Sequence, residues 1–141
     1  MTLDLERIQT KLEDISKALA RLKRFQNTPK EAFLSDEDSQ DIARSRLLTA
    51  MEAALNICYH VTAQLLKRVP EDYADCFRLL GEENLIEQDL ARKLSQMARF
   101  RNRLVHLYWD IDYGAVYEII QHHLRDLEEF SFQVAQWTAR R

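Results

Sequence analysis

The sequence predicts an all-α protein, an up-and-down bundle of four long helices and one short helix. Its 141 residues include only two glycines and two prolines, so the backbone has few places to turn sharply. A composition of 46% hydrophobic and 30% charged residues is typical of long amphipathic helices rather than strands. The length is that of one domain, residues 1–141, and no linker, internal repeat or low-complexity tract divides it.

The first half of the chain predicts two helices. Apolar residues three or four positions apart indicate a helix from Leu5 to about Phe25, which Pro29 brings to an end. Ser35 and the acids after it are suited to begin a second helix, which continues to Val69. At about 30 residues this helix is far longer than the average of ~11–12, and such a length is typical of a bundle or a dimer seam.

The second half predicts one short and two long helices. The short third helix covers residues 72–84, with Gly81 placed to cap its C-terminus. The fourth begins within residues 84–87, and the acids and glycine of residues 110–114 mark the break after it. In the last helix, apolar residues from Val116 to Val134 face inward.

Charge and cysteine content limit the class of protein. The N-terminus is charged from Asp4 and has no apolar core of a signal peptide, and no apolar run approaches the ~20 residues of a membrane span. A net charge of −3 argues against a general nucleic-acid coating protein but leaves room for a local basic site. Cys58 and Cys76 lack metal or redox spacing, which favours reduced thiols and a cytoplasmic location over a disulfide between them.

The histidines do not form a recognisable metal site. A di-metal bundle uses Glu-x-x-His, whereas the nearest pair here, Glu118 and His122, is one residue too far apart. His122 and His123 point about 100° apart on a helix, so we expect His122 at the surface, His123 at the core edge, and His60 packed or at the rim. Walker, GxSxG and Cys-His signatures are also missing, so we expect no metal and no cofactor.

The segment RFRNRLVHLYW, residues 99–109, is rich in arginine and contains no acid. On an ideal helix Arg99, Asn102, Arg103 and His106 share one polar face. A solvated helix end, where cations favour the negative pole of the helix dipole, explains Arg99 and Arg103.

Arg101 needs a different explanation, because it lies in the apolar row with Leu104 and Tyr108. A guanidinium cannot lose its charge, and burying it unpaired is costly. Its position therefore predicts an acidic partner, a subunit interface or a cleft that holds an anion. Arg101 and His106 diverge by about 140° on a straight helix, so a shared phosphate requires local unwinding, a junction between helices or a two-fold axis.

The stretch from Arg101 to Tyr108 resembles the R-x4-H-x-Y signature of HepT-like toxins, a branch of the HEPN (higher eukaryotes and prokaryotes nucleotide-binding) superfamily. LARKLSQMARFRN before it and WDIDYGAVYEII after it also resemble that family, as does the long second helix preceded by FLSDED. The resemblance covers nearly the whole chain. It implies a HEPN-like bundle and a metal-independent ribonuclease that acts as a homodimer, with the motif at a cleft along the dimer interface. It also implies a minimal nucleotidyltransferase antitoxin that silences the toxin by adding AMP to Tyr108.

The residue types of the motif suit RNA cleavage without a metal. RNA carries its own nucleophile, the 2′-hydroxyl, and the His106 side chain can take or give a proton near neutral pH. Arg101 is suited to hold the phosphate, with Asn102 and Arg103 in supporting, phosphate-binding roles; Asn102 can also orient the His106 ring. The motif contains one histidine in each chain, which leaves either the base or the acid missing. A second copy of His106 from the dimer would complete the site.

Two other interpretations remain at this stage. A non-catalytic module would use the same arginine and histidine to hold a nucleotide or to present a substrate to a nucleotidyltransferase partner. A purely structural helical dimer would pair Arg101 with a buried acid and bind nothing. RNA turnover in EDTA distinguishes the ribonuclease from both.

Overall fold

The computed structural model describes residues 3–106 and 109–140, which form seven α-helices, a 3-10 helix and a π-helix, and no strand. The elements in order are α1 (Leu5–Lys23), η1 (Arg24–Asn27), α2 (Lys30–Leu34), α3 (Glu37–Val61), η2 (Thr62–Leu66), α4 (Tyr73–Glu82), α5 (Gln88–His106), α6 (Tyr113–His122) and α7 (Leu124–Thr138).

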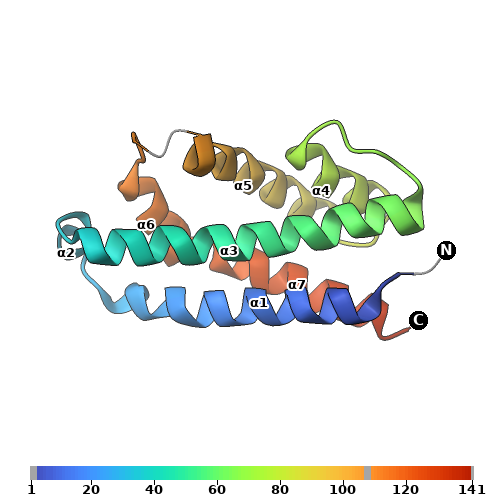
Figure 1. Ribbon diagram of the computed structural model, residues 1–141, viewed down its shortest axis with the longest axis horizontal. Helices are drawn as coiled ribbons and strands as arrows, with labels where there is room; N and C mark the ends of the chain where they lie inside the picture. The colour runs from blue at the N-terminus through green and yellow to red at the C-terminus, as the bar shows by residue number, and fades with distance from the viewer. Residues whose placement is uncertain (1–2, 107–108, 141) are drawn as a thin grey trace.

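The long helices alternate in direction, and both chain ends lie at the same end of the bundle (Figure 1). Helix α3 runs through the middle, with α1 on one side and α5 on the other (Figure 1). The predicted all-α bundle is confirmed. None of the helices in the described part of the chain combines the length and the apolar composition that a membrane crossing requires.

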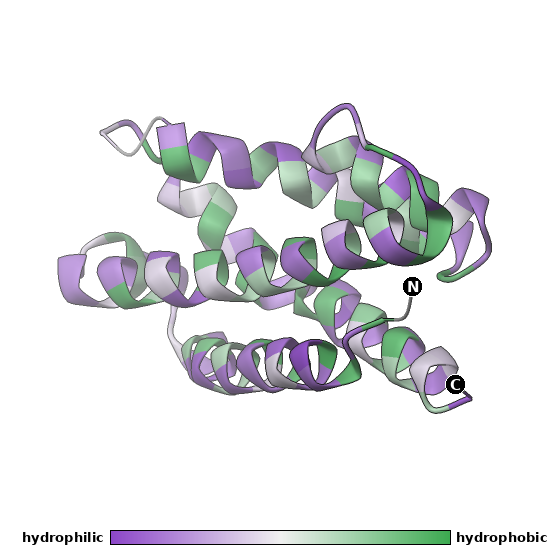
Figure 2. Ribbon diagram, turned by 45° about the vertical axis from the view of Figure 1, so that its right-hand side comes forward, coloured by the Kyte–Doolittle hydropathy of each residue, from purple (hydrophilic) through white to green (hydrophobic). Residues whose placement is uncertain are grey.

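The core is built from the apolar faces of these helices, and each long helix also carries polar residues along its length (Figure 2). Phe33, Leu47, Leu94 and Phe130, from four different helices, are all fully buried. Burying such a side chain stabilises the fold by about 1.5–3 kcal/mol. The packing of amphipathic faces is therefore the main force that positions α5, the helix that carries the candidate site.

Two predicted helices are each divided in the structure. The second ends as an α-helix at Val61, continues as η2 and stops at Lys67, whose φ of 55° is left-handed. The last is split at His123, whose φ of −125° and ψ of 2° interrupt the helix between α6 and α7. Periodicity alone did not reveal these breaks, because the apolar spacing continues across both. Cys58 and Cys76 are buried free thiols, as expected.

The start of α3 and the short helix α2 also differ from the prediction. Asp36, not Ser35, caps α3, and its Oδ1 accepts from the Asp38 amide at 3.1 Å. The Ser35 hydroxyl instead donates to the Glu31 carbonyl oxygen at 2.9 Å and closes α2. Helix α2 has only five residues, which is too few for a repeating spacing of apolar residues to be recognised in the sequence.

Gly81 has a different role from the predicted C-terminal cap. It lies within α4, and Asn84 adopts the left-handed conformation after the helix, with a φ of 59°. A Cβ atom on Gly81 would lie 2.6 Å from the Cβ of Ala91 in α5. Glycine is needed here because α4 and α5 approach each other too closely for any side chain.

We predict that Gly81→Ala destabilises the protein. The steric clash costs about 1–3 kcal/mol against the ~1 kcal/mol that alanine gains over glycine inside a helix, so we expect a net loss of up to about 2 kcal/mol. Urea unfolding measures the difference. Gly114→Ala is the control, because its Cβ would lie 3.1 Å from Asp112 Oδ1, the N-cap acceptor of α6, and we expect a smaller loss of stability than at Gly81. Equal stability of the two variants would contradict a close contact at Gly81.

Candidate active site

The Arg101 side chain lies buried between three helices and is only 10% exposed. Its Nε donates a hydrogen bond to the Glu52 carboxylate of α3, and its Nη1 donates to Asn102 Oδ1 at 3.1 Å. Its Cζ lies 4.4 Å from the centre of the Tyr73 ring at the start of α4. The sequence predicted an acidic partner, a subunit interface or an anion-binding cleft around Arg101. The structure contains the acidic partner, Glu52.

Two opposing effects act on the charge of Arg101. Burial disfavours the charged form and lowers the pKa, whereas the hydrogen bond and the charge of Glu52 raise it. The net pKa lies above the usual value of an arginine. The guanidinium therefore keeps its positive charge at a fixed position, and Glu52 balances that charge.

The other residues of the motif lie at the C-terminal end of α5. Arg103 and His106 are exposed, and the Arg103 guanidinium lies 5.5 Å from the centre of the Phe100 ring. Within residues 3–106 and 109–140, no hydrogen bond joins Arg101 to His106, and the Asn102 side chain contacts Arg101 rather than His106. One chain thus holds the arginine and the histidine on different faces. Tyr108 lies outside the described residues.

Two residues near the motif were not identified from the sequence. Glu52 is the single charged residue between Arg46 and His60. Its isolation in a largely apolar stretch is the sequence feature that could have identified it as the partner of Arg101. Arg44 of α3 donates from Nη2 to the Leu104 carbonyl oxygen at 3.4 Å, and its Nε is buried without a hydrogen-bond partner among the described atoms. Arg44 therefore places a second guanidinium beneath the end of α5, where the helix dipole favours a cation.

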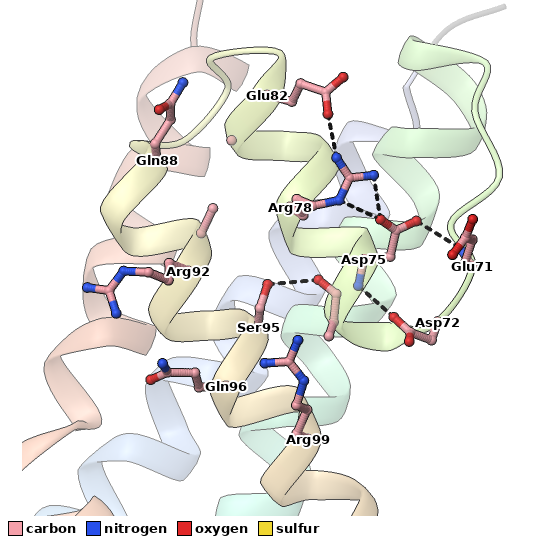
Figure 3. A pocket seen from close by; sticks show the side chains of 13 residues that line it. Glu71, Asp72, Asp75, Arg78, Glu82, Gln88, Arg92, Ser95, Gln96 and Arg99 are labelled. Carbon is pink, nitrogen blue, oxygen red and sulfur yellow. Dashed lines mark hydrogen bonds and ion pairs between the residues drawn. The ribbon is translucent and has the colours of Figure 1, made fainter.

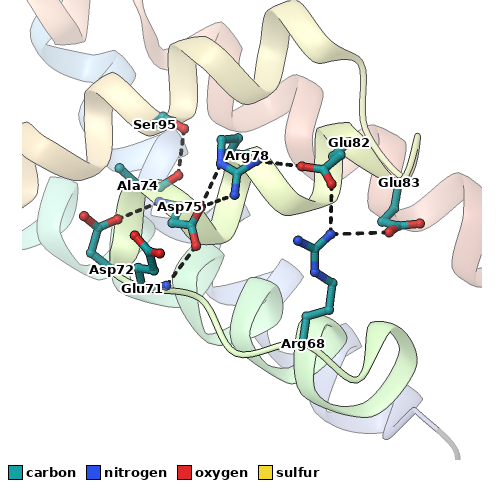
Figure 4. Close-up of polar contacts among 9 residues, drawn as sticks. All are labelled: Arg68, Glu71, Asp72, Ala74, Asp75, Arg78, Glu82, Glu83 and Ser95. Atoms are coloured by element: carbon teal, nitrogen blue, oxygen red, sulfur yellow. Dashed lines mark hydrogen bonds and ion pairs between the residues drawn. The ribbon is translucent and has the colours of Figure 1, made fainter.

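A hollow of about 570 Å³ lies between α4 and α5, lined by four acids, including Asp75 and Glu82, and three arginines (Figure 3). Arg78 bridges Asp75 and Glu82 at 2.6 Å each, and Arg68 contacts Glu82 at 3.0 Å (Figure 4). The backbone N–H of Glu71 and the Arg78 side chain hold the pKa of Asp75 below its usual value. Because the acids neutralise the arginines, this hollow does not suit a phosphate.

The histidines outside the motif are not gathered into a site. The described residues contain no group of three or more His, Cys, Asp or Glu side chains placed to hold a metal ion. His122 is exposed as expected, but the His123 side chain is 56% exposed rather than at the core edge, because the chain turns there between α6 and α7. His60 accepts a hydrogen bond from the Asp4 amide at 2.8 Å and ties the start of α1 to α3.

We predict that Glu52→Gln destabilises the protein, because it leaves the Arg101 charge buried without its counter-ion. A fully buried pair broken in this way costs about 3–5 kcal/mol, and since the Glu52 side chain is 46% exposed, we expect about 1–2 kcal/mol. Urea unfolding measures the change. Glu13→Gln on the exposed side of α1 is the control, and an equally small effect at both positions would show that Glu52 does not support Arg101.

Comparison with known proteins identifies the family of this helical chain. The family described as Ribonuclease HepT-like matches residues 15–134. The mRNA nuclease HepT of Shewanella oneidensis is 32% identical over 123 residues, which cover 87% of this chain and 92% of the relative. The tRNA nuclease HepT of Aphanizomenon flos-aquae is 31% identical over 127 residues, covering 90% and 86%. A solved structure of the tri-AMPylated Shewanella oneidensis HEPN toxin in complex with MNT antitoxin aligns with a TM-score of 0.84 at 29% identity, covering 96% of this chain and 99% of that one. The chain belongs to the HepT-like ribonuclease family of the HEPN superfamily.

Proposed function

We propose that this chain is the ribonuclease toxin of a toxin–antitoxin pair, and that it cleaves RNA in the cytoplasm. The observation that carries the proposal is the fixed charge of Arg101. Glu52 of α3 and Tyr73 of α4 hold its guanidinium in place, and the helix that contains Arg101, α5, ends at the exposed His106. Phosphodiester cleavage requires a cation that stabilises the phosphate and a side chain that transfers protons, and an arginine and a histidine are residue types that supply them. The similarity to relatives named mRNA nuclease and tRNA nuclease supports RNA as the substrate class.

The proposed reaction uses the 2′-hydroxyl of RNA as the nucleophile. The 2′-oxygen attacks the adjacent phosphorus while its proton passes to a base, and the bond from phosphorus to the 5′-oxygen breaks as an acid protonates that oxygen. Arg101 stabilises the additional negative charge on the phosphorus centre, using Nη groups because its Nε is bound to Glu52. The products are a 2′,3′-cyclic phosphate and a 5′-hydroxyl.

A homodimer would bring Arg101 and His106, which lie on different faces of one chain, to a shared cleft. The two side chains are five residues apart on one helix and diverge by about 140°. A two-fold axis beside the end of α5 would bring both copies of the motif to one cleft and supply one His106 as base and the other as acid. The exposure of His106 and Arg103 at that helix end supports such an arrangement.

The proposed control of activity is AMP transfer to Tyr108 by a minimal nucleotidyltransferase antitoxin. The Tyr108 oxygen would attack the α-phosphorus of ATP, pyrophosphate would leave, and the phenolic proton would pass to a base. The solved relative is itself a tri-AMPylated toxin in complex with MNT antitoxin, which supports this partner class. An AMP group two residues beyond His106 would oppose RNA binding by bulk and by like-charge repulsion.

We predict that purified wild-type protein cleaves RNA in EDTA and leaves 2′,3′-cyclic phosphate ends. His106→Ala should lower the cleavage rate at least 10²-fold, the lower limit for loss of a general acid–base group. Rates are followed by gel electrophoresis of labelled RNA, the termini by mass spectrometry, and the dimer by size-exclusion chromatography. His60→Gln serves as the control, because its amide oxygen can still accept from the Asp4 amide.

Cleavage by His106→Ala at the wild-type rate would refute the assignment of His106. RNA binding without turnover by the wild-type chain would refute the ribonuclease and favour the non-catalytic binding module.

We predict that a minimal nucleotidyltransferase antitoxin modifies Tyr108. Co-incubation with the antitoxin and ATP should add the mass of AMP to the peptide that contains Tyr108 and suppress RNA cleavage, whereas Tyr108→Phe should not be labelled there. Tyr59→Phe is the control, because Tyr59 is half-buried against Tyr73 and far from the motif in sequence. Labelling that is undiminished in Tyr108→Phe would place the modification elsewhere.

A further inference from the structure

Trp109 places a large apolar side chain in solvent beside the candidate motif. The residue is 70% exposed, whereas Trp137, the second tryptophan of the chain, is half-buried against the core. Single exposed apolar residues are common on protein surfaces, so exposure alone does not identify a binding site. For Trp109, the anchored backbone and the neighbouring charges add the information that exposure lacks.

The turn that carries Trp109 is anchored on both sides. It lies at the end of the bundle opposite the two chain termini (Figure 1). His106, three positions earlier, ends α5, and Ile111, two positions later, packs against the core. Asp112 then caps α6, where its Oδ1 accepts from the Ala115 amide at 3.1 Å. Three residues span at most about 11 Å, so the Cα atom of Trp109 lies within that distance of the Cα atom of His106.

Two exposed arginines share the face of α5 that carries His106. At 100° per residue, Arg99, Arg103 and His106 lie within about 60° of one another around the helix. Neither arginine forms an ion pair with any of the described residues, whereas Arg92 and Arg101 are each paired with a carboxylate. Arg99 borders the hollow on the α4 side, whose acids offset part of its charge. Arg103, one turn before His106, is therefore the cation of this face best placed for a phosphate.

The residue after Trp109 decides which part of a nucleotide the indole suits. Asp110 is exposed and lines a hollow of about 230 Å³ together with Phe100 and Arg103. Its carboxylate repels a phosphate group at Trp109, whereas a base carries no charge. An exposed indole face can stack on any base, because every base has a π-face. Trp109 is thus suited to a base, and Arg103 to the phosphate of the same strand.

A nucleic acid suits this surface better than a second copy of the chain does. Around a two-fold axis the same patch of both subunits meets, so Arg99 and Arg103 would approach their own copies. Like charges placed opposite each other oppose association. A polyanion that lies between the two copies removes this repulsion. The exposed indole beside these arginines therefore fits a strand held next to the motif.

We propose that Trp109 stacks on an unpaired base of the RNA next to the bond cleaved at His106, while Arg103 binds a phosphate of the same strand. The inference rests on the proposed ribonuclease function and adds how the substrate is held. A base can stack on the indole only when it has left its own helix, so this contact selects single-stranded segments and loops over duplex RNA. Because all bases stack, the contact gives little sequence preference.

The test measures binding of a labelled 2′-O-methyl RNA of about ten nucleotides, within the range of single-strand site sizes. This probe lacks a free 2′-hydroxyl and cannot be cleaved by the proposed reaction, so its binding is independent of catalysis. A second probe has the same backbone and length but no bases. Fluorescence anisotropy at several salt concentrations gives the dissociation constant and its salt dependence for the wild type, Trp109→Ala, Trp109→Phe and Arg103→Ala.

We expect Trp109→Ala to raise the dissociation constant of the RNA probe about 5- to 150-fold, the range for loss of one base–aromatic stack. Its salt dependence should stay that of the wild type, because no phosphate contact is lost. Trp109→Phe should recover much of the affinity, and the probe without bases should bind Trp109→Ala as it binds the wild type. Arg103→Ala should instead make the slope of log K against log salt shallower by about 0.7.

The indole itself provides a second measurement. In Trp137→Phe, Trp109 is the one tryptophan that remains, and we expect the RNA probe to quench its emission. Phe132→Ala is the matched control, because it removes a 57% exposed ring from α7. Phe132 lines a hollow with Leu85, which precedes the start of α5, at the opposite end of that helix from His106. This variant should bind both probes as the wild type does.

Wild-type affinity of Trp109→Ala for the RNA probe would overturn the proposal, as would emission of Trp109 that the probe leaves unchanged. It would also be overturned if size-exclusion chromatography showed that Trp109→Ala loses the dimer while RNA binding is unaltered, because the indole would then belong to an interface between copies. A wild-type chain that fails to cleave natural RNA refutes the ribonuclease alone, provided that Trp109→Ala still weakens binding of the inert RNA probe.

Discussion

Apolar packing brings α3, α4 and α5 together, and the burial of one arginine side chain, Arg101, constrains how these helices meet around the candidate site. The Arg101 guanidinium retains its charge, so it must find an acidic partner within the protein. Glu52 from α3 provides that partner, and the face of the Tyr73 ring at the start of α4 adds a cation–π contact. The three helices can move relative to one another only by exposing or separating these groups. Gly81, which lets α4 approach α5 closely, supports the same packing.

The inward position of Arg101 sets the orientation of the residues that follow it. On a helix fixed at that point, Arg103 and His106 must face solvent at the C-terminal end of α5. Arg44 adds a second guanidinium there, and its Nη2 donates to the Leu104 carbonyl oxygen. A single chain therefore presents one buried cation and one exposed histidine on different faces. The proposed dimer is the simplest arrangement that brings both types of group to one phosphate.

The net charge of −3 conceals an uneven distribution across α5. On the α4 side, carboxylates and arginines neutralise each other through short ion pairs (Figure 4). On the side of α6 and α7, Asp89 pairs with Arg92 and Lys93 at 2.6 and 3.2 Å, whereas Arg125 is exposed. Screening limits the reach of each charge to roughly 8 Å at physiological ionic strength, so local density rather than total charge decides where a polyanion binds. An acidic protein can accordingly act on RNA.

The sequence by itself determined the helical class, the approximate positions of the long helices and the motif from Arg101 to Tyr108, because apolar period and motif spacing are local properties. It also indicated that Arg101 needs a partner, since a charge in an apolar row is costly wherever the row packs. Only the tertiary structure decided that Glu52 is that partner, that Gly81 serves helix contact rather than capping, and that the two sides of α5 differ in charge. These features depend on which residues distant in the chain meet, and that is settled by the packing of whole helices rather than by any one segment.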